Sequence, residues 1–216
     1  MIKLVSLLII AYLLGSIPSG IWIGKLFFHV DIRRHGSKNI GATNTFRVLG
    51  PLAGTIVTIL DIGKGYLATW IPMQFGISSW YPLIFGVAAV LGHTFSIFDH
   101  FKGGKAVATS AGMLMAYNFG FFWIAAAAFT LCIFLTSMVS LGSMLGFVII
   151  VIAAYFTHDT ALTILAFVLT IFIFYRHRNN IKKIIHGQEN IVPFGLYYWY
   201  LKYLKKPLNN YCFNRE

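Results

Sequence analysis

Long apolar segments alternate with short polar ones along the chain. Apolar stretches at about 3–24, 51–74 and 80–98 each approach the roughly 20 residues that a helix needs to cross a bilayer. From 106 to 175 the chain is almost uncharged, and polar turns near 118, 138 and 158 divide this region into four pieces. The first piece, 106–117, is short and rich in small residues, so we expect it to be half-buried or re-entrant. The pattern predicts an all-helical, polytopic integral membrane protein.

The composition excludes a soluble domain of this length. Hydrophobic residues make up 58% of the 216 positions, charged residues only 11%, and the mean hydropathy is +0.75. The net charge of +11 would suit nucleic acid in a soluble protein, but in a chain this apolar it indicates cytoplasmic loops and anionic lipid or substrate. We therefore expect membrane lipids as partners and no nucleic acid. Cys132 and Cys212 do not indicate a disulfide framework.

Lysine and arginine gather in three polar stretches, and this sets the expected orientation. The stretches are 25–47, 99–105 and 176–183, whereas the other turns carry no Lys or Arg. Because positively charged loops stay in the cytoplasm, all three should face inward, with the N-terminus outside and the C-terminus cytoplasmic. An even number of segments must then separate the second stretch from the third. Four segments give about seven transmembrane helices and two give five, and we favour seven.

The first polar stretch has the composition of an anion site. Its glycines let backbone N–H groups close on oxygen atoms, and a helix that starts near residue 42 would point its own N–H groups at the loop. Arg47, one turn after Asn44, would offer a bidentate fork to a phosphate. A solvated, positive-inside loop without a binding role is the alternative. The candidates for substrate contact here are Ser37, Asn39, Gly41, Asn44 and Arg47.

The second stretch combines a Gly-Gly turn with lysines. Lys102, Gly103, Gly104 and Lys105 lack the spacing of a P-loop but have similar glycine and lysine chemistry. His93 lies near the end of the preceding apolar span. It is either a site residue or a hydrogen-bonded packing residue.

Two further pairs of polar residues are each three positions apart. His177 and Asn180 in the third stretch share one face of a helix end. Asp61 and Lys64 lie inside an apolar segment, where ionisable side chains usually pair or serve a pathway. A mutual ion pair without a binding role is the alternative for these two.

Missing motifs exclude several reaction classes. His93 is followed by Asp99, which does not fit the His-x4-Asp spacing of soluble and peripheral acyltransferases. No His-x3-His, His-Glu-x2-His or cysteine cluster indicates zinc, and no Gly-x-Ser-x-Gly elbow indicates a serine nucleophile. We therefore expect no metal, no cofactor and a substrate that is already chemically activated.

Several motifs occur in order: Gly15–Gly20, Gly36–Asn44 with Arg47, Asp61–Gly65, Gly92-His93 with Phe98, Phe101–Lys105, Ala108-Thr109, and His177–Ile181 with Gly187 and Glu189. Together they resemble the PlsY family, the bacterial membrane acyl-phosphate:glycerol-3-phosphate acyltransferases. The likeness covers about residues 15 to 190. Ser96 stands where the family usually has Pro, and Ala106 where it usually has Gly.

The resemblance implies transfer of a fatty acyl group from acyl phosphate to the sn-1 hydroxyl of glycerol-3-phosphate, which gives lysophosphatidic acid and phosphate. It also implies a compact seven-helix fold, no need for acyl-CoA, and a soluble partner enzyme that makes acyl phosphate. The catalytic candidates are then Ser37, Arg47, His93, Lys105, His177 and Asn180. The candidates for substrate or phosphate binding are Asn39, Gly41, Asn44, Asp61, Lys64, Lys102, Gly103, Gly104, Gly187 and Glu189.

We expect a single membrane domain over 1–216, with a family-like core at 1–190 and a basic, aromatic cytoplasmic tail at 191–216. The expected location is the bacterial plasma membrane, with the active site on its cytoplasmic side. An organic-anion transporter that uses the same basic loops is the alternative function. An inverted repeat would favour it, and none is evident. The sequence leaves the oligomeric state, the preferred acyl chain and the proton acceptor open.

Overall fold

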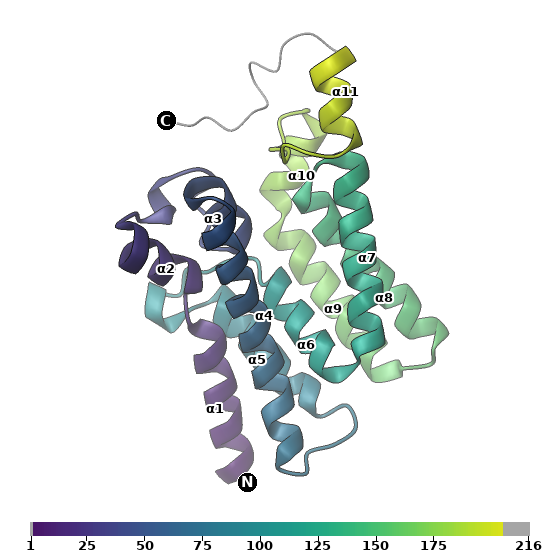
Figure 1. The fold of residues 1–216 in the computed structure, drawn as a ribbon. Coiled ribbons are helices and arrows are strands. Elements are labelled where there is room, and N and C mark those ends of the chain that lie inside the picture. Colours follow the sequence, from purple (N-terminus) through teal and green to yellow (C-terminus); the bar gives the residue numbers. More distant parts are fainter. Residues whose placement is uncertain (1, 205–216) are drawn as a thin grey trace. The chain divides into compact units, whose positions relative to one another are not determined.

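The computed structural model describes residues 2–204, and the regular elements among them are all helices, which confirms the all-helical prediction. Contacts group these residues into two compact units, the first ending at Phe122 and the second beginning at Trp123 (Figure 1). The tail is described as far as Leu204, and Cys212 lies outside the described residues. The prediction of a single domain stays a prediction.

The first unit contains α1 (Ile2–Ser16), α2 (Ser19–Phe28), the 3-10 turn η1 (Ile32–Arg34), α3 (Ala42–Leu49), α4 (Pro51–Gln74), α5 (Pro82–Thr94), the 3-10 turn η2 (Ile97–Asp99) and α6 (Val107–Tyr117). The second unit contains most of α7 (Phe119–Thr136) and all of α8 (Val139–Phe156), α9 (Thr160–Arg176), α10 (Arg178–Ile185) and α11 (Leu196–Leu204).

Within the described residues, three segments are long and apolar enough to cross a membrane. They are α7, α8 and Pro82–Asp99, which joins α5 to η2. Two bent pairs, α1 with α2 and α9 with α10, raise the number of candidate spans to as many as five if each pair counts as one. α6 has 11 residues and is therefore only about 17 Å long, close to half the thickness of the hydrocarbon core. The count of seven stays a prediction.

The first apolar segment, predicted as one span over 3–24, is built from two helices. α1 ends at Ser16 and α2 begins at Ser19, with a bend of 46° between them. Pro18 lacks the N–H group that a continuous helix needs, and it disfavours helical geometry at Ile17, the residue before it. The break therefore has a local cause, although the run is apolar on both sides of it.

The polar turns near 118, 138 and 158 are helix boundaries, as predicted. Asn118 Oδ1 accepts hydrogen bonds from the N–H groups of Gly120 and Phe121 at the start of α7. Asp159 Oδ1 accepts one from the N–H of Leu162 at the start of α9. A helix start leaves N–H groups without intrahelical partners, and these side chains satisfy some of them. The polar residues in this uncharged region therefore mark where one helix stops and the next begins.

α4 is the central helix of the first unit, where it packs most extensively against α6 and also contacts α1, α3 and α5 (Figure 1). A Cβ atom built on Gly65 would lie 2.0 Å from the carbonyl oxygen of Thr109 on α6. A Cβ on Gly112 of α6 would lie 1.9 Å from the carbonyl oxygen of Ile62 on α4. One glycine from each helix thus lets the two backbones touch, which is how helices in membranes pack most closely.

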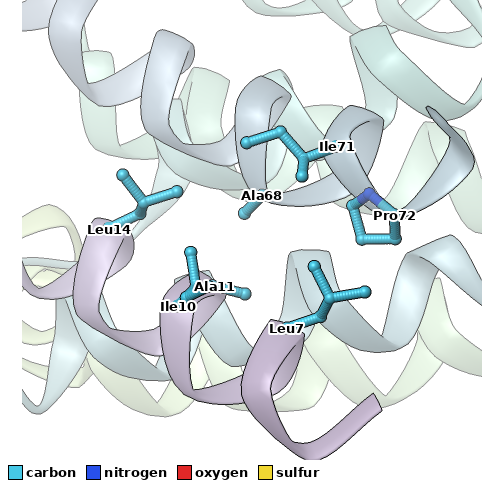
Figure 2. A pocket seen from close by; sticks show the side chains of 7 residues that line it. All are labelled: Leu7, Ile10, Ala11, Leu14, Ala68, Ile71 and Pro72. Carbon is cyan, nitrogen blue, oxygen red and sulfur yellow. The ribbon is translucent and has the colours of Figure 1, made fainter. Parts of the chain in front are cut away.

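A small apolar pocket lies between α1 and α4 (Figure 2). Its cavity volume of about 10 Å³ is far below the 300 Å³ or more that a small-molecule site usually offers. The pocket is therefore a packing gap between two helices. Its lining consists of Leu7, Ile10, Ala11, Leu14, Ala68, Ile71 and Pro72.

In the second unit, the chain returns after α10 to the turn between α7 and α8. The N–H of Val192 donates to the carbonyl oxygen of Ser137, at a distance of 2.8 Å. α8 packs along α9 in the same unit. The end of α7, the beginning of α8 and the segment around Val192 therefore lie together.

The two glycines Gly63 and Gly65 of α4 provide a matched test of the α4–α6 contact. Gly65→Ala should lower the free energy of unfolding by about 1–3 kcal/mol or more, because its methyl group has no room against Thr109. Gly63→Ala should raise it by up to about 1 kcal/mol, since a Cβ there meets nothing within 4 Å and alanine favours helix. Thermal unfolding in detergent measures both. Equal effects of the two substitutions would contradict the proposed close approach.

Candidate active site

The polar loop between η1 and α3 is held together by the side chain of Asn44. This residue of α3 is 1% exposed. Its Nδ2 lies 3.0 Å from the carbonyl oxygen of Ile32, 3.2 Å from that of His35 and 2.8 Å from that of Asn39. Its Oδ1 accepts a hydrogen bond from the N–H of Ser37, at 2.8 Å. A single buried amide therefore closes the loop on itself through backbone contacts.

Close packing within this loop brings Arg47 beside it. Gly36 has a left-handed conformation with φ of +57°, and a Cβ there would lie 2.5 Å from Asn44 Oδ1 and 3.3 Å from Arg47 Cδ. Asn39 Oδ1 accepts a hydrogen bond from the N–H of Gly41, the residue that precedes the first turn of α3. The half-buried Arg47 side chain thus runs along the loop whose N–H groups Asn44 and Asn39 orient.

An ion-pair network joins the first polar stretch to the second. Arg33 Nε donates to Asp31 at 2.9 Å, and Arg33 Nη1 donates to Asp99 at the beginning of the second stretch. The hydrogen bond from Arg33 holds the pKa of Asp31 well below its usual range, and the same bond raises the pKa of Arg33. A carboxylate with a depressed pKa contributes its stability above its unfolded pKa and loses it only as the pH falls into the acid range. The network therefore persists around neutral pH.

The Gly-Gly turn of the second stretch lies directly against His93, at the end of α5. The N–H of Gly104 donates to the carbonyl oxygen of His93 at 3.1 Å. A Cβ on Gly103 would lie 2.1 Å from that same oxygen, and a Cβ on Gly104 would lie 2.2 Å from Nε2 of the His93 ring. Both positions therefore require glycine because of close approach. Exposed Lys102 and half-buried Lys105 flank the turn.

Asp61 and Lys64 form a buried ion pair on α4, with 2.9 Å between Lys64 Nζ and Asp61 Oδ1. Lys64 Nζ also donates to the carbonyl oxygen of Ile17 at the break between α1 and α2. Ser19 Oγ donates to Asp61 Oδ1 at 3.0 Å, and Nδ1 of His93 lies 3.8 Å from that oxygen. The structure thus shows the mutual ion pair that was the alternative expectation, and it places this pair beside His93.

The third polar stretch belongs to the second unit, where His177 lies between α9 and α10. The side chain is 2% exposed, and its Nδ1 lies 2.9 Å from the carbonyl oxygen of Ile173. A carbonyl oxygen only accepts, so Nδ1 carries the proton of this hydrogen bond. In the neutral ring, Nε2 is then the basic nitrogen.

Asn180 and Glu189, both predicted site residues, are hydrogen-bonded to each other in the second unit. Asn180 Nδ2 donates to Oε1 of Glu189 at 2.7 Å, and Ser140 Oγ donates to the same oxygen at 2.8 Å. Glu189 is 5% exposed, and Gly187, with φ of +65°, provides the turn that precedes it. A buried carboxylate is costly without such donors, so Ser140 and Asn180 stabilise it.

The structure therefore divides the predicted residues into two groups. The first and second stretches come together in the first unit. The second unit contains His177, Asn180, Gly187 and Glu189. Within residues 2–204, no group of three His, Cys, Asp or Glu side chains is placed to hold a metal ion.

Three contacts that matter to these sites were not predicted. The Arg33–Asp99 contact joins residues 66 positions apart, and nothing in the sequence pairs them. Ser140 lies in an uncharged run, where a serine resembles any small packing residue. Ser19 had one signal, because it falls within the Gly15–Gly20 motif.

A buried ion pair on an apolar helix and basic, glycine-rich loops are typical of helical membrane proteins that act on anions. The sequence model of the family described as Glycerol-3-phosphate acyltransferase matches residues 5–187. The chain is 58% identical over 197 residues to the glycerol-3-phosphate acyltransferase of Levilactobacillus brevis, covering 89% of this chain and 95% of the relative. It is 57% identical over 199 residues to glycerol-3-phosphate acyltransferase 2 of Lactobacillus acidophilus, covering 92% and 94%.

Two crystal structures of PlsY, an integral membrane glycerol 3-phosphate acyltransferase, are similar to this chain. The glycerol 3-phosphate form has a TM-score of 0.82 at 37% identity, and the lysophosphatidic acid form has a TM-score of 0.79 at 36% identity. Each match covers 87% of this chain and 94% of the crystallised one. The chain belongs to the glycerol-3-phosphate acyltransferase family and is an integral membrane enzyme of that class.

Asn44 and Asn39 provide a matched test of how the first loop is organised. Asn44→Asp should open the loop, because it replaces the Nδ2 donor to three carbonyl groups with an oxygen that repels them. Asn39→Asp should leave the loop closed, since only its Oδ1 is used and aspartate keeps that acceptor. We expect tryptic cleavage after exposed Lys38 to accelerate at least about tenfold in the first variant and little in the second. Equal cleavage rates would show that Asn44 does not hold the loop.

The buried Asp61–Lys64 pair should couple strongly in a double-mutant cycle. Asp61→Asn or Lys64→Met alone should each cost about 3–5 kcal/mol, because the remaining partner stays buried without its counter-charge. The double variant should cost clearly less than the sum of the two. Lys25→Met is the control, since Lys25 pairs with Asp31 at 3.7 Å from an exposed position and should cost at most about 1 kcal/mol. Thermal unfolding of the parent, the two single variants, the double variant and the control measures the coupling. Additive effects of the two single substitutions would argue against it.

Proposed function

We propose that this enzyme transfers a fatty acyl group from acyl phosphate to the sn-1 hydroxyl of glycerol-3-phosphate. The hydroxyl oxygen attacks the acyl carbonyl carbon, and the bond from that carbon to the phosphate oxygen breaks. The hydroxyl proton is transferred to a base, and lysophosphatidic acid and phosphate are released. Acyl phosphate is a mixed anhydride with a good leaving group, so no covalent enzyme intermediate is needed.

One observation carries the proposal: Arg33 and Asp99 hold two basic, glycine-rich loops together within the first unit. The reaction brings two phosphate groups close to one another, and their repulsion must be offset by cations and N–H donors. The first loop contributes Arg47, and the second contributes Lys102 and Lys105. Membership of the glycerol-3-phosphate acyltransferase family supports glycerol-3-phosphate as the acyl acceptor.

We assign the residues of the first unit as follows. Arg47, Lys102 and Lys105 bind phosphate oxygens by charge. Gly41, Gly103 and Gly104 form the backbone beside these cations, and the N–H groups of Gly41 and Gly104 hold the loops in shape through Asn39 and His93. Ser37 and Asn39 orient phosphate or hydroxyl. Asn44 holds Ser37 and Asn39 in position through hydrogen bonds to their backbone groups. Asp61 and Lys64 act indirectly, through the α1–α2 break and the position of His93.

His177 and Asn180 are assigned a role in proton handling or phosphate binding, with Glu189 and Gly187 holding Asn180 in place. The proton acceptor is His93, His177 or an oxygen of a substrate phosphate. The hydrogen bond from Nδ1 to Ile173 leaves Nε2 of neutral His177 as its basic atom, which suits such a role. Catalysis is mainly positioning and electrostatic stabilisation of the developing oxyanion.

We also infer the arrangement in the membrane. The basic stretches face the cytoplasm, the N-terminus faces outward, and about seven helical segments lie at membrane depth if α4, α6 and the bent pairs are included. A soluble enzyme that makes acyl phosphate would then reach the active site from the cytoplasm. The small residues within 106–175, on α6 and on α8, offer apolar faces against which an acyl chain can pack.

The acyl transfer itself is tested with purified protein in detergent, acyl phosphate and labelled glycerol-3-phosphate. We expect labelled lysophosphatidic acid to form. An organic-anion transporter would give no product in detergent, where no compartments exist, and absence of product would refute the proposal.

Arg47→Ala should raise the KM for glycerol-3-phosphate at least about tenfold, because a charge-assisted hydrogen bond to phosphate is worth about 1.5–3 kcal/mol. Arg34→Ala is the matched control, since Arg34 is an exposed cation of the same stretch and should change KM less than about twofold. Steady-state kinetics with both variants measures the difference. An unchanged KM in Arg47→Ala would remove Arg47 from the phosphate site.

If a histidine acts as the general base, its replacement should lower kcat. If His93 or His177 takes the proton, its replacement by alanine should lower kcat by about 100-fold or more at saturating substrate. Rates within a few-fold of the parent for both variants would exclude a histidine base and leave a substrate phosphate oxygen as acceptor. Thermal unfolding of each variant controls for loss of fold.

A further inference from the structure

The C-terminal helix α11 lies beyond the segment that the family model matches. The family match ends at residue 187, whereas α11 covers Leu196–Leu204 and has the sequence LYYWYLKYL. Five of its nine residues are Tyr or Trp, and one is Lys. Neither the acyl-transfer chemistry nor the polar loops account for this composition.

The beginning of α11 is fixed to the end of α7. The N–H of Tyr198 donates to Oγ of buried Ser137 at 3.0 Å, and the N–H of Val192 donates to the carbonyl oxygen of the same residue. The rings of Trp199 and Phe134 meet edge to face, with 6.1 Å between their centroids. α7 has the length and apolar composition of a membrane span and ends at Thr136, so α11 starts just beyond the end of this candidate span.

One face of α11 is packed on the protein and another is exposed. Leu201 is 7% exposed and Tyr197 and Tyr198 are half-buried, which identifies the packed face. The exposed apolar and aromatic side chains follow the i, i+3, i+4, i+7, i+8 pattern of an apolar helical stripe. They are Leu196 (48%), Trp199 (43%), Tyr200 (49%), Tyr203 (73%) and Leu204 (77%).

The chemistry of this stripe matches a lipid interface. Trp and Tyr have apolar rings with a polar edge, and they concentrate where hydrocarbon meets headgroups. Lys202 flanks the stripe with its Nζ 5.3 Å from the centre of the Tyr203 ring. The sequence continues with Lys205 and Lys206, and the last residue, Glu216, is the one acidic residue after 190.

We propose that α11 lies in the headgroup region at the end of α7 and binds anionic phospholipid. The exposed stripe enters the boundary of the acyl chains, while exposed Lys202 contacts the headgroups. This interaction is independent of the proposed acyl transfer, so the failure of either leaves the other standing.

The test uses the full-length protein in lipid nanodiscs, with Cys132→Ala and Cys212→Ser as background. A polarity-sensitive fluorophore is attached at Tyr203→Cys on the stripe. The matched control is Lys183→Cys, an exposed position on α10. The bilayers contain phosphatidylcholine with or without phosphatidylglycerol, and lipids with a nitroxide near the headgroup act as quenchers. Tyr200→Cys provides a second stripe position.

In phosphatidylglycerol bilayers we expect a blue-shifted emission at 203 and strong loss of intensity with nitroxide lipid, and neither at 183. Removal of phosphatidylglycerol should shift the emission at 203 to the red, and Lys202→Gln should reduce that dependence. Emission at 203 that is water-like in every bilayer would overturn the proposal. A shielded probe that nitroxide lipid does not quench would also overturn it, because a protein partner would then cover the stripe.

Discussion

The ammonium group of Lys64 and Ser19 together satisfy two groups inside the first unit, the carboxylate of Asp61 and the carbonyl oxygen of Ile17. Charges and open backbone groups are tolerated at membrane depth only when protein groups satisfy them. The ion pair therefore fastens α4 to the break at Pro18, because Lys64 adds a second donor to the carbonyl that the N–H of Ser19 already contacts. α2 can then leave the direction of α1 and carry the chain toward the first polar loop, while Asp61 remains beside His93.

Close approaches at glycine residues arrange the rest of the first unit around this break. Gly65 and Gly112 bring α4 and α6 into backbone contact, and Gly103 and Gly104 bring the second loop onto His93. Each contact leaves no room for a methyl group, so small errors in packing cannot be absorbed by a rotamer change. The geometry of the polar loops thus depends on helix contacts well inside the unit.

Short-range features such as helix boundaries and caps could be predicted from the sequence. Contacts between residues far apart in the chain could not. The polar turns of the uncharged region were found because capping residues interrupt an apolar pattern, and Asn118 and Asp159 do cap helices. The break at Pro18 was missed as a structural element because hydropathy is the same on both sides of it. The side chain of Asn44 hydrogen-bonds with four backbone groups of the loop, which composition alone does not indicate, and its substrate-binding role stays a prediction. Arg33 and Asp99 are paired by the fold, which no spacing rule expresses.

Because Arg33 is paired with Asp31 and Asp99, salt should affect the exposed cations of the first loop and the contact between the two loops differently. Salt screens exposed cations such as Arg34 and Lys38 over about 8–10 Å at physiological concentration, so their attraction for an approaching anion fades as salt rises. The partly buried Arg33 network is screened much less, and the two loops stay joined. Raising the salt concentration therefore slows the approach of anions to the exposed cations without separating the two loops.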